Sequence, residues 1–235
     1  MLSIIIPTFR EEKTIEASIQ AVKVGLTLPH EVIVSDGGSD DQTVAIAKKF
    51  ADQVIVGESG VSRQRNAGAR AAHGDFLVFI DAGAKVGDPD IFFKRALKDF
   101  DDPRVVGVCA AQRVFPELET YADWFIYGFF SHAYRVCNNW LNIGTASGKL
   151  QMVRQSAFAQ TTGYREDLVA GEDTEMFNRL SRLGRTRFDP HLVVYHANRR
   201  ARRIGWPKLL WEWFVNTLWL ILFKKAYSRQ WKPIR

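Results

Sequence analysis

The sequence is poor in cysteine, a basic leader is not visible in its opening residues, and its C-terminal tail has no apolar run of membrane-spanning length. Cys109 and Cys137 are too few for a disulfide framework and lack metal-ligand spacing. The opening residues, 2–6, are not a basic leader with a small-residue cleavage site, so no secretory signal is expected. The uninterrupted apolar part of the tail, 218–223, is far shorter than the ~20 residues that a membrane span needs. We therefore expect reduced cysteines and a cytoplasmic location.

Glycine-rich loops that cradle phosphates are also missing. A dinucleotide site would need G-x-G-x-x-G directly after the first strand, so that the backbone could approach a pyrophosphate. Residues 7–12 instead read Pro-Thr-Phe-Arg-Glu-Glu, and no G-x-x-x-x-G-K-[ST] occurs. These two modes of phosphate binding are excluded.

What the chain has is a globular composition and a regular alternation of strands and helices. With 46% hydrophobic and 25% charged residues in 235 positions, we expect one large domain, or one domain with an appendage. The alternation up to residue 87 demands parallel strands joined by right-handed crossovers. The expected strands are 4–6 (ended by Pro7), 31–35, 54–56 and 76–80, and the expected helices are 11–24, 44–50 and 61–73.

The pattern after residue 87 is less regular, which suits a half that builds a substrate site. We expect helices from Pro89 to about Phe100 and over 172–183. Further strands are expected at 104–114, 146–154 and 192–196. The fold class is therefore α/β, with a mostly parallel central sheet flanked by helices.

Charged residues follow the expected strands, where open α/β sheets place their ligands. Asp81 follows the strand 76–80, which is apolar on both faces and so belongs in the middle of the sheet. The sequence Asp-Ala-Gly at 81–83 is equally consistent with a simple turn. Glu11, Asp36 and Arg65 occupy comparable positions, although Asp36 alone reads as a turn residue and Arg65 alone as a solvated helix face. The four together favour a nucleotide pocket.

Ordered motifs carry a resemblance to a known family. They are residues 4–12, 32–43, 65–68 (Arg-Asn-Ala-Gly), 79–82 (Phe-Ile-Asp-Ala), and 163–166 (Gly-Tyr-Arg-Glu) followed by 171–174 (Gly-Glu-Asp-Thr). In this order, over about residues 2–200, the chain resembles the family 2 glycosyltransferases of the GT-A fold. The resemblance implies a sugar-nucleotide-dependent transferase of hexosyltransferase type that uses a UDP- or GDP-sugar.

The resemblance also implies roles for individual residues. The implied nucleotide-binding residues are Pro7, Thr8, Glu11, Asp36, Arg65 and Asp81. Asp81 opens the position of the D-x-D motif, which holds a divalent ion, Mg²⁺ or Mn²⁺, on the diphosphate. The third position is Gly83 instead of Asp, so Asp81 lacks its usual partner, and His196 matches a later histidine that joins the metal in related enzymes. His196 reads equally well as a core or surface histidine.

The leaving diphosphate and the acceptor need charged groups of opposite kinds. The leaving group develops negative charge, which positive groups are expected to stabilise. The candidates are a metal held by Asp81, together with His196, and one or two of the arginines at 199, 200, 202 and 203. Of these arginines, Arg199 and Arg200 are the predicted diphosphate-binding residues. By family position Asp173 is the general base for an acceptor hydroxyl and Glu172 supports it, and a single displacement inverts the anomeric centre. An ionised lipid phosphate as acceptor would need no base.

The C-terminal tail differs from the body in charge and in aromatic content. Residues 199–235 hold ten basic residues against Glu212 alone, a net charge of +9, which leaves −3 for the rest of the chain. Five of the seven tryptophans also lie there. Within 206–223, polar residues recur every fourth position at Lys208, Glu212 and Asn216. We expect 206–225 to form an amphipathic helix on an anionic membrane surface, the alternative being packing on protein.

These expectations define a domain plan and three functional readings. Residues 1–204 form the GT-A domain, with a nucleotide-binding half (1–87) and an acceptor-side half (88–204), and 205–235 form the basic, Trp-rich tail. The aromatic segment 121–130 lies either on the lipid-facing side or in the core. Nucleic acid is not an expected partner, because its sites interleave aromatic and basic residues more evenly.

We expect a glycosyltransferase at the inner face of the membrane acting on a lipid-linked or membrane-bound acceptor. The alternatives are a polyprenyl-phosphate glycosyltransferase and a non-catalytic nucleotide-sugar-binding protein.

Overall fold

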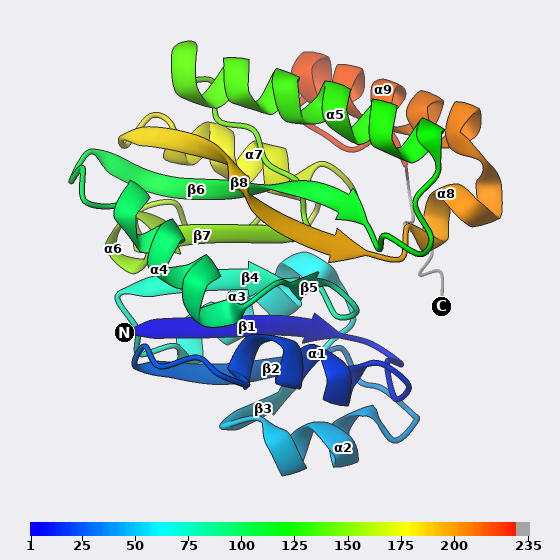
Figure 1. The fold of residues 1–235 in the computed structure, drawn as a ribbon. Coiled ribbons are helices and arrows are strands. Elements are labelled where there is room, and N and C mark those ends of the chain that lie inside the picture. Colours follow the sequence, from blue (N-terminus) through cyan, green and yellow to red (C-terminus); the bar gives the residue numbers. More distant parts are fainter. Residues whose placement is uncertain (229–235) are drawn as a thin grey trace.

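The computed structural model describes residues 1–228. Its first half is the expected alternation (Figure 1). The elements are β1 (Leu2–Thr8), α1 (Ile15–Lys23), β2 (His30–Asp36), α2 (Thr43–Phe50), β3 (Gln53–Val56), α3 (Val61–Ala71) and β4 (Phe76–Ile80). The pairs β1–β2, β2–β3 and β1–β4 are all parallel, as predicted.

The second half completes the same sheet and adds a layer of helices. Its elements are β5 (Lys85–Val86), α4 (Pro89–Asp99), β6 (Val105–Val114), α5 (Tyr121–Arg135) with a turn of π-helix η1 (Val136–Trp140), β7 (Leu150–Arg154), α6 (Gln155–Ala159), α7 (Glu172–Leu180), β8 (Arg185–His196), α8 (Arg199–Ile204) and α9 (Trp206–Phe223). The expected strand 192–196 begins seven residues earlier, at Arg185. Sequence reasoning missed this part because buried Thr186 and Phe188 alternate with exposed arginines instead of forming an apolar run.

Within residues 1–228, eight strands form one mixed sheet in the order β3-β2-β1-β4-β7-β6-β8-β5. β7 is antiparallel to both β4 and β6, and β5 is antiparallel to β8, whereas β6 and β8 are parallel. The α/β class with a sheet flanked by helices is confirmed, and the antiparallel strands lie in the half whose pattern was less regular.

Pro7 does not end the first strand, contrary to the expectation. β1 continues to Thr8, and Pro7 pairs in register with Ser35 of β2. The pairing of β1 with β4 stops at Ile5, so no ladder on that side requires an N–H from Pro7. All seven residues of β1 are buried, which places this strand between the two apolar layers of the core. Gly68 brings α3 close to β1, because a Cβ there would overlap the side chain of Ile5.

Helices α5 and α9 lie side by side above the second half of the sheet (Figure 1). The ring of Phe130 packs edge-on against Trp213 at 5.5 Å, and Tyr127 packs against Trp206 at 5.4 Å. α9 thus packs on the domain while keeping much of its apolar surface outside. Within residues 1–228, no helix combines the length and the apolar character that crossing a membrane requires.

Candidate functional site

A cavity of about 1670 Å³ opens at the carboxyl ends of the central strands and runs beneath α5 and α9. It gathers almost all the residues singled out in the sequence, although they come from both halves of the chain. Those on its wall are Pro7, Thr8, Glu11, Arg65, Asp81, Glu172, Asp173, His196, Arg199 and Arg200. Asp36 is the one predicted nucleotide-binding residue that does not line it.

Arg65 joins the two sides of this cavity. It extends from α3, is only 2% exposed, and its Nη1 donates to Glu172 Oε1 at 3.1 Å. Its Nη2 donates to Asp81 Oδ1 at 3.1 Å and to the carbonyl oxygen of Gly148 at 2.9 Å. The ring of Tyr164 lies under the guanidinium at 5.2 Å. Arg65 is therefore a buried junction between the carboxylates of Asp81 and Glu172, not a solvated helix face.

Asp81 turns its carboxylate into the cavity, although its backbone does form a turn. The N–H of Ala84 donates to the Asp81 carbonyl, and Gly83 has a φ of +80°. Lys149 Nζ donates to Asp81 Oδ2 at 2.9 Å. Burial opposes ionisation, but Lys149 and then Arg65 outweigh it and lower the pKa of Asp81 below its usual range. Both oxygens of Asp81 are thus engaged by cationic side chains of the protein.

Asp173 stands at the start of α7, on the wall of the cavity. Gly171, with a φ of +78°, turns the chain into this helix, and the N–H of Thr174 donates to Asp173 Oδ1 at 2.8 Å. Asp173 Oδ2 faces Gly148, where an added Cβ would lie 3.2 Å from it. Burial, and then the charge of Glu172, raise the pKa of Asp173 to about 7. Such a carboxyl exchanges protons near neutral pH, as a general base must.

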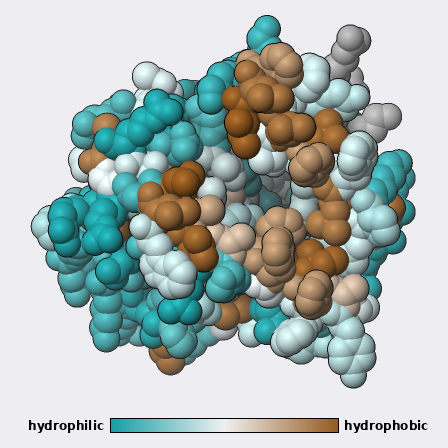
Figure 2. Space-filling view, turned by 90° about the horizontal axis from the view of Figure 1, so that it is seen from above, coloured by the Kyte–Doolittle hydropathy of each residue, from teal (hydrophilic) through white to brown (hydrophobic). Residues whose placement is uncertain are grey.

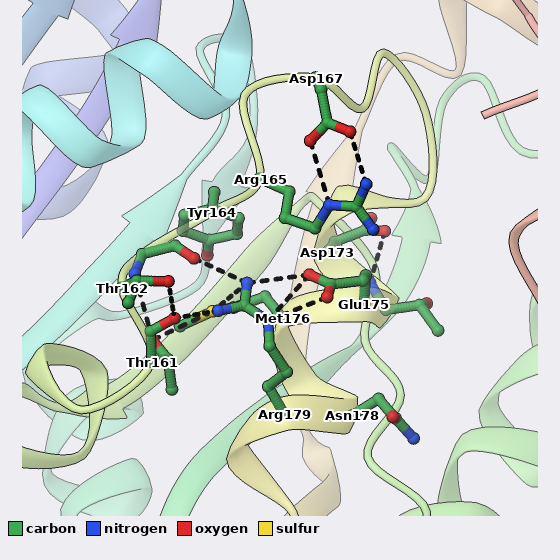
Figure 3. A network of polar contacts seen from close by, with 12 residues as sticks. Thr161, Thr162, Tyr164, Arg165, Asp167, Asp173, Glu175, Met176, Asn178 and Arg179 are labelled. Carbon is green, nitrogen blue, oxygen red and sulfur yellow. Dashed lines mark hydrogen bonds and ion pairs between the residues drawn. The ribbon is translucent and has the colours of Figure 1, made fainter. Parts of the chain in front are cut away.

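The position of α7 depends on a polar network that ties together motifs distant in the sequence. Asn66 donates to the Tyr164 carbonyl at 2.8 Å and accepts from the Tyr164 N–H at 2.7 Å. Arg179 pairs with Glu175 on the same helix and donates to the Gly163 carbonyl at 2.6 Å, which anchors α7 to this loop (Figure 3). The motifs at 65–68, 163–166 and 171–174 therefore form one structural unit around Asp173.

His196 ends β8 on the same cavity wall and is 6% exposed. Its Nδ1 accepts a hydrogen bond from the Asn198 backbone N–H at 3.0 Å, and its ring packs edge-on against Tyr127 at 5.2 Å. Burial, reinforced by Lys149, lowers the pKa of His196 to about 3, so the ring is neutral at neutral pH. A neutral ring that accepts at Nδ1 carries its proton on Nε2.

The donor set does not match a metal centre. His196 accepts at Nδ1 and so carries its proton, not a free lone pair, on Nε2. Each oxygen of Asp81 accepts from one cationic side chain, so a metal ion at this carboxylate would have to compete with Lys149 and Arg65. Within residues 1–228, no group of three or more His, Cys, Asp or Glu side chains is placed to hold a metal ion. The predicted metal ligands Asp81 and His196 thus share the cavity without forming a coordination set.

Arg199 and Glu11 pair with each other on the wall of the cavity. Arg199 Nη2 lies 3.3 Å from Glu11 Oε1, and a Cβ added to Gly83 would lie 3.0 Å from the same nitrogen. Arg200 also faces the cavity, and burial lowers its pKa. Arg202 instead binds the carbonyls of Ala197 and Leu118, so it acts in the structure of the α5–α8 corner.

Asp36 is held at the end of β2 behind Thr8. Its Oδ1 accepts from the backbone N–H groups of Gly38 and Ser39 at 3.0 and 2.7 Å. Its Oδ2 accepts from the hydroxyls of Thr8 and Ser39 at 3.1 and 2.6 Å. This carboxylate shapes the loop and orients Thr8 toward the cavity. Its expected contact with the base remains a prediction.

Sequence reasoning missed three polar residues that the structure places here. Lys149 binds Asp81, and Gln64 donates to the carbonyls of Thr8 and Ser35, which joins the ends of β1 and β2. Asp123 accepts from Asn198 Nδ2 at 2.7 Å. It also accepts from Trp206 Nε1 at 2.9 Å, which fixes α5 to the start of α9. A sequence signal existed only for Asp123, which completes a capping box with Thr120 at the start of α5.

The cavity also has an apolar wall under α5 and α9. Tyr127, Phe130, Tyr134, Leu209, Trp213 and Leu220 contribute to it. Outside, the same two helices expose large apolar side chains, which gather on this face of the molecule (Figure 2). They include Trp124, Phe125, Phe129, Trp211, Phe214, Ile221, Leu222 and Phe223.

The family model that describes glycosyl transferase family 2 matches residues 3–162, more than half of the chain. The chain belongs to glycosyl transferase family 2. The resemblance seen in the ordered motifs is therefore confirmed.

Two curated relatives match the family 2 chain over most of its length. An O-antigen chain rhamnosyltransferase of Salmonella typhimurium is 26% identical over 86% of this chain and 68% of its own length. A succinoglycan biosynthesis protein of Rhizobium meliloti is 28% identical over 90% of this chain and 66% of its own. The chain thus spans about two thirds of the length of these relatives.

Solved structures share the fold. A mannosyltransferase from Pyrobaculum calidifontis, in complex with GDP-Man and Mn²⁺, superposes with a TM-score of 0.73 at 21% identity, over 91% of this chain and 61% of that one. A glucosyl-3-phosphoglycerate synthase from Mycobacterium tuberculosis, in complex with Mn²⁺, UDP and its product, gives 0.61 at 20% identity, over 97% and 81%. These likenesses confirm the predicted GT-A fold.

Proposed function

We propose that this chain transfers a hexosyl group from a nucleotide-diphosphate sugar to a hydroxyl of a lipid-linked or membrane-bound acceptor. The observation that carries this proposal is the double contact of Arg65 with Asp81 and Glu172. These contacts connect the end of β4, the expected donor position at Asp81, with the start of α7, which carries the proposed base Asp173. A site for binding alone would not need a carboxyl with a pKa of about 7 on the far wall.

The donor lies along the carboxyl ends of β1 and β4. Pro7, Thr8 and Glu11 line the part of the cavity next to these strands and would flank the base and ribose. Asp36 supports Thr8 from behind. The neighbours with bound GDP-Man and bound UDP support a nucleoside diphosphate without choosing the base. The diphosphate then reaches the cationic groups around Asp81, and Arg199 and Arg200 extend that charge along the wall.

Asp173 serves as the general base. It removes the acceptor proton as the acceptor oxygen attacks C1 of the sugar, while the bond from C1 to the diphosphate oxygen breaks and its electron pair leaves with the diphosphate. One displacement of this kind inverts the anomeric centre. Burial first, and then Glu172, which Arg65 holds beside Asp173, raise the pKa of this base to about 7.

The acceptor side of the cavity and the outer face of α5 and α9 suit a lipid. The aromatic wall under these helices accommodates an apolar chain, and the exposed aromatic residues above it suit an anionic membrane surface at its cytoplasmic side. α9 turns its polar Asn216 inward, where it binds Ser228, and exposes Trp211 and Phe214. This orientation favours membrane contact over a soluble helix surface. The basic residues Arg229, Lys232 and Arg235 of the tail lie outside the described residues.

A polyprenyl-phosphate acceptor is the second candidate. A dolichyl-phosphate β-glucosyltransferase from mouse, 26% identical over 58% of this chain and 50% of its own length, favours it. Such an acceptor is already ionised, so its attack on the sugar would need no general base and Asp173 would have no proton to remove. The base-like pKa of Asp173 therefore supports a hydroxyl acceptor.

The proposal is tested by measuring nucleotide binding and sugar transfer separately. Binding is measured by thermal shift with UDP, GDP and their hexose conjugates. Turnover is measured as release of nucleoside diphosphate, with a membrane extract that contains lipid-linked saccharides as the source of acceptors. Binding with turnover supports a transferase. Binding without turnover supports a nucleotide-sugar-binding protein, and no response to any nucleotide contradicts both readings.

A further inference from the structure

The residue at position 83 marks where this site departs from a metal centre. Gly83 takes a φ of +80°, a conformation that favours glycine, and a Cβ there would lie 3.0 Å from Arg199 Nη2. A second carboxylate at this position would therefore point at a guanidinium. Arg199 lies next to the place where the second acidic ligand of a D-x-D motif would be.

Lys149 lies on the other side of the same carboxylate. Its Nζ is 2.9 Å from Asp81 Oδ2, while Arg65 Nη2 is 3.1 Å from Asp81 Oδ1. Lys149 keeps 34% of its side chain exposed, so its ammonium faces the cavity as well as the carboxylate. Arg65 is 2% exposed and is held by three acceptors, so it cannot turn to a ligand. Lys149 is the cation of this pair that reaches the donor.

Arg199 is similarly poised. Its contacts with Glu11 are long, at 3.3 and 3.5 Å, and 33% of its side chain is exposed. A guanidinium binds phosphate oxygens with paired N–H groups, and an ammonium binds them as a point charge. Lys149 and Arg199 both line the cavity, one on Asp81 and one beside Gly83, the two positions of the D-x-D motif that would hold a metal.

We propose that Lys149 and Arg199 take the place of a divalent cation and bind the donor diphosphate directly. The proposal rests on the proposed function, since it concerns the diphosphate of the same donor. As the bond from C1 to the diphosphate oxygen breaks, the charge that develops on the leaving oxygens is met by the ammonium and the guanidinium. Asp81 and Glu11 hold these cations in place before the donor arrives.

The test compares nucleotide binding with and without metal. Isothermal titration of the full chain with UDP and GDP is run in EDTA and in Mn²⁺, and electron paramagnetic resonance measures free Mn²⁺ with nucleotide alone and with protein added. We expect affinities that differ by no more than about threefold between EDTA and Mn²⁺, which is well under the effect of one charge-assisted contact. The protein is expected to deplete no Mn²⁺ beyond what the nucleotide binds.

Substitution of the two cations completes the test. Lys149→Ala and Arg199→Ala are expected to weaken diphosphate binding by roughly tenfold each, because each removes a charge-assisted contact. Binding of the nucleoside itself is expected to stay unchanged. Lys149→Met keeps a long, unbranched side chain without the charge and guards against misfolding, and Lys98→Ala, at an exposed site of α4, is the matched control.

The outcomes separate this inference from the function on which it rests. A Mn²⁺ requirement for UDP or GDP binding, or an unchanged preference for diphosphate over nucleoside in the Lys149 and Arg199 variants, overturns the inference and leaves the transferase proposal standing. Failure to bind any nucleotide under both conditions overturns the transferase proposal itself.

Discussion

Arg65 Nη1 lies 3.1 Å from Glu172 Oε1, although the two residues are 107 positions apart in the chain. This ion pair is buried, with 2% and 11% of the two side chains exposed. It fixes the start of α7, and so the proposed base Asp173, relative to α3 and to the end of β4. One guanidinium therefore sets the distance between the walls of the cavity that carry Asp81 and Glu172.

Arg65→Ala is expected to destabilise the fold strongly. It leaves two partly buried carboxylates, Asp81 and Glu172, without this partner, and removal of one member of a buried pair costs about 3–5 kcal/mol. Arg63→Ala, on the same helix but with an exposed side chain, is the control and is expected to cost less than ~1 kcal/mol. Urea unfolding measures both free energies of unfolding. Equal losses would show that Arg65 is no junction.

Asp173→Asn is expected to lower turnover by roughly 10²–10⁴-fold, the usual contribution of a positioned general base. Nucleotide binding should persist, since Asp173 lies on the acceptor side. Asp167→Asn, an exposed carboxylate paired with Arg165 on the same loop, is the matched control. Release of nucleoside diphosphate reports turnover. A loss smaller than tenfold would favour an already ionised acceptor such as a lipid phosphate.

Turnover is expected to rise with pH through about 7, because Asp173 acts as a base only after losing its proton at a pKa of about 7. Below that value the rate should fall by roughly tenfold per pH unit as the carboxyl becomes protonated. The Asp173→Asn variant should show no such step. A rate–pH profile of both proteins between pH 5 and about 9 checks this, and an inflection retained in the variant would assign the titration to another group.

Gly144→Ala is expected to cost several kcal/mol, because its Cβ would overlap the backbone carbonyl of Phe177 on α7. Gly128→Ala is the matched control. Nothing lies within 4 Å of its Cβ, and it is inside helix α5, so alanine there should stabilise by roughly 0.5–1 kcal/mol. Thermal unfolding measures both changes. Similar shifts in the two variants would show that α7 does not pack on residue 144.

The combined substitution of Trp211, Phe214 and Leu222 by serine is expected to reduce flotation with anionic liposomes, because it removes exposed apolar surface from α9. The control replaces two other exposed residues by serine: Val24, which follows α1, and Ile91, which lies on α4. Flotation is measured at low and high salt. Equal recovery of both variants with the liposomes would count against membrane contact through α9.

Local patterns in the sequence determined the first half of the fold and most of the wall of the site. The strand 76–80 and the position of Asp81 at its end could be predicted, because a short apolar run ended by turn residues is a local pattern that indicates a buried strand. The parallel direction of strands β1 to β4 followed from their spacing, since parallel strands require crossovers. Family motifs then assigned Glu172 and Asp173 to the same site.

Only the tertiary structure decided which charges meet. Lys149 reaches Asp81 across 68 positions, and Arg199 reaches Glu11 across 188, because β7 enters antiparallel between β4 and β6 and β8 returns the chain to the site. No local period encodes that register. Likewise, the polar stripe of α9 was visible in the sequence, but packing against the domain turned Asn216 inward and left the apolar side exposed. The sequence determined the segments, and long-range packing determined their partners.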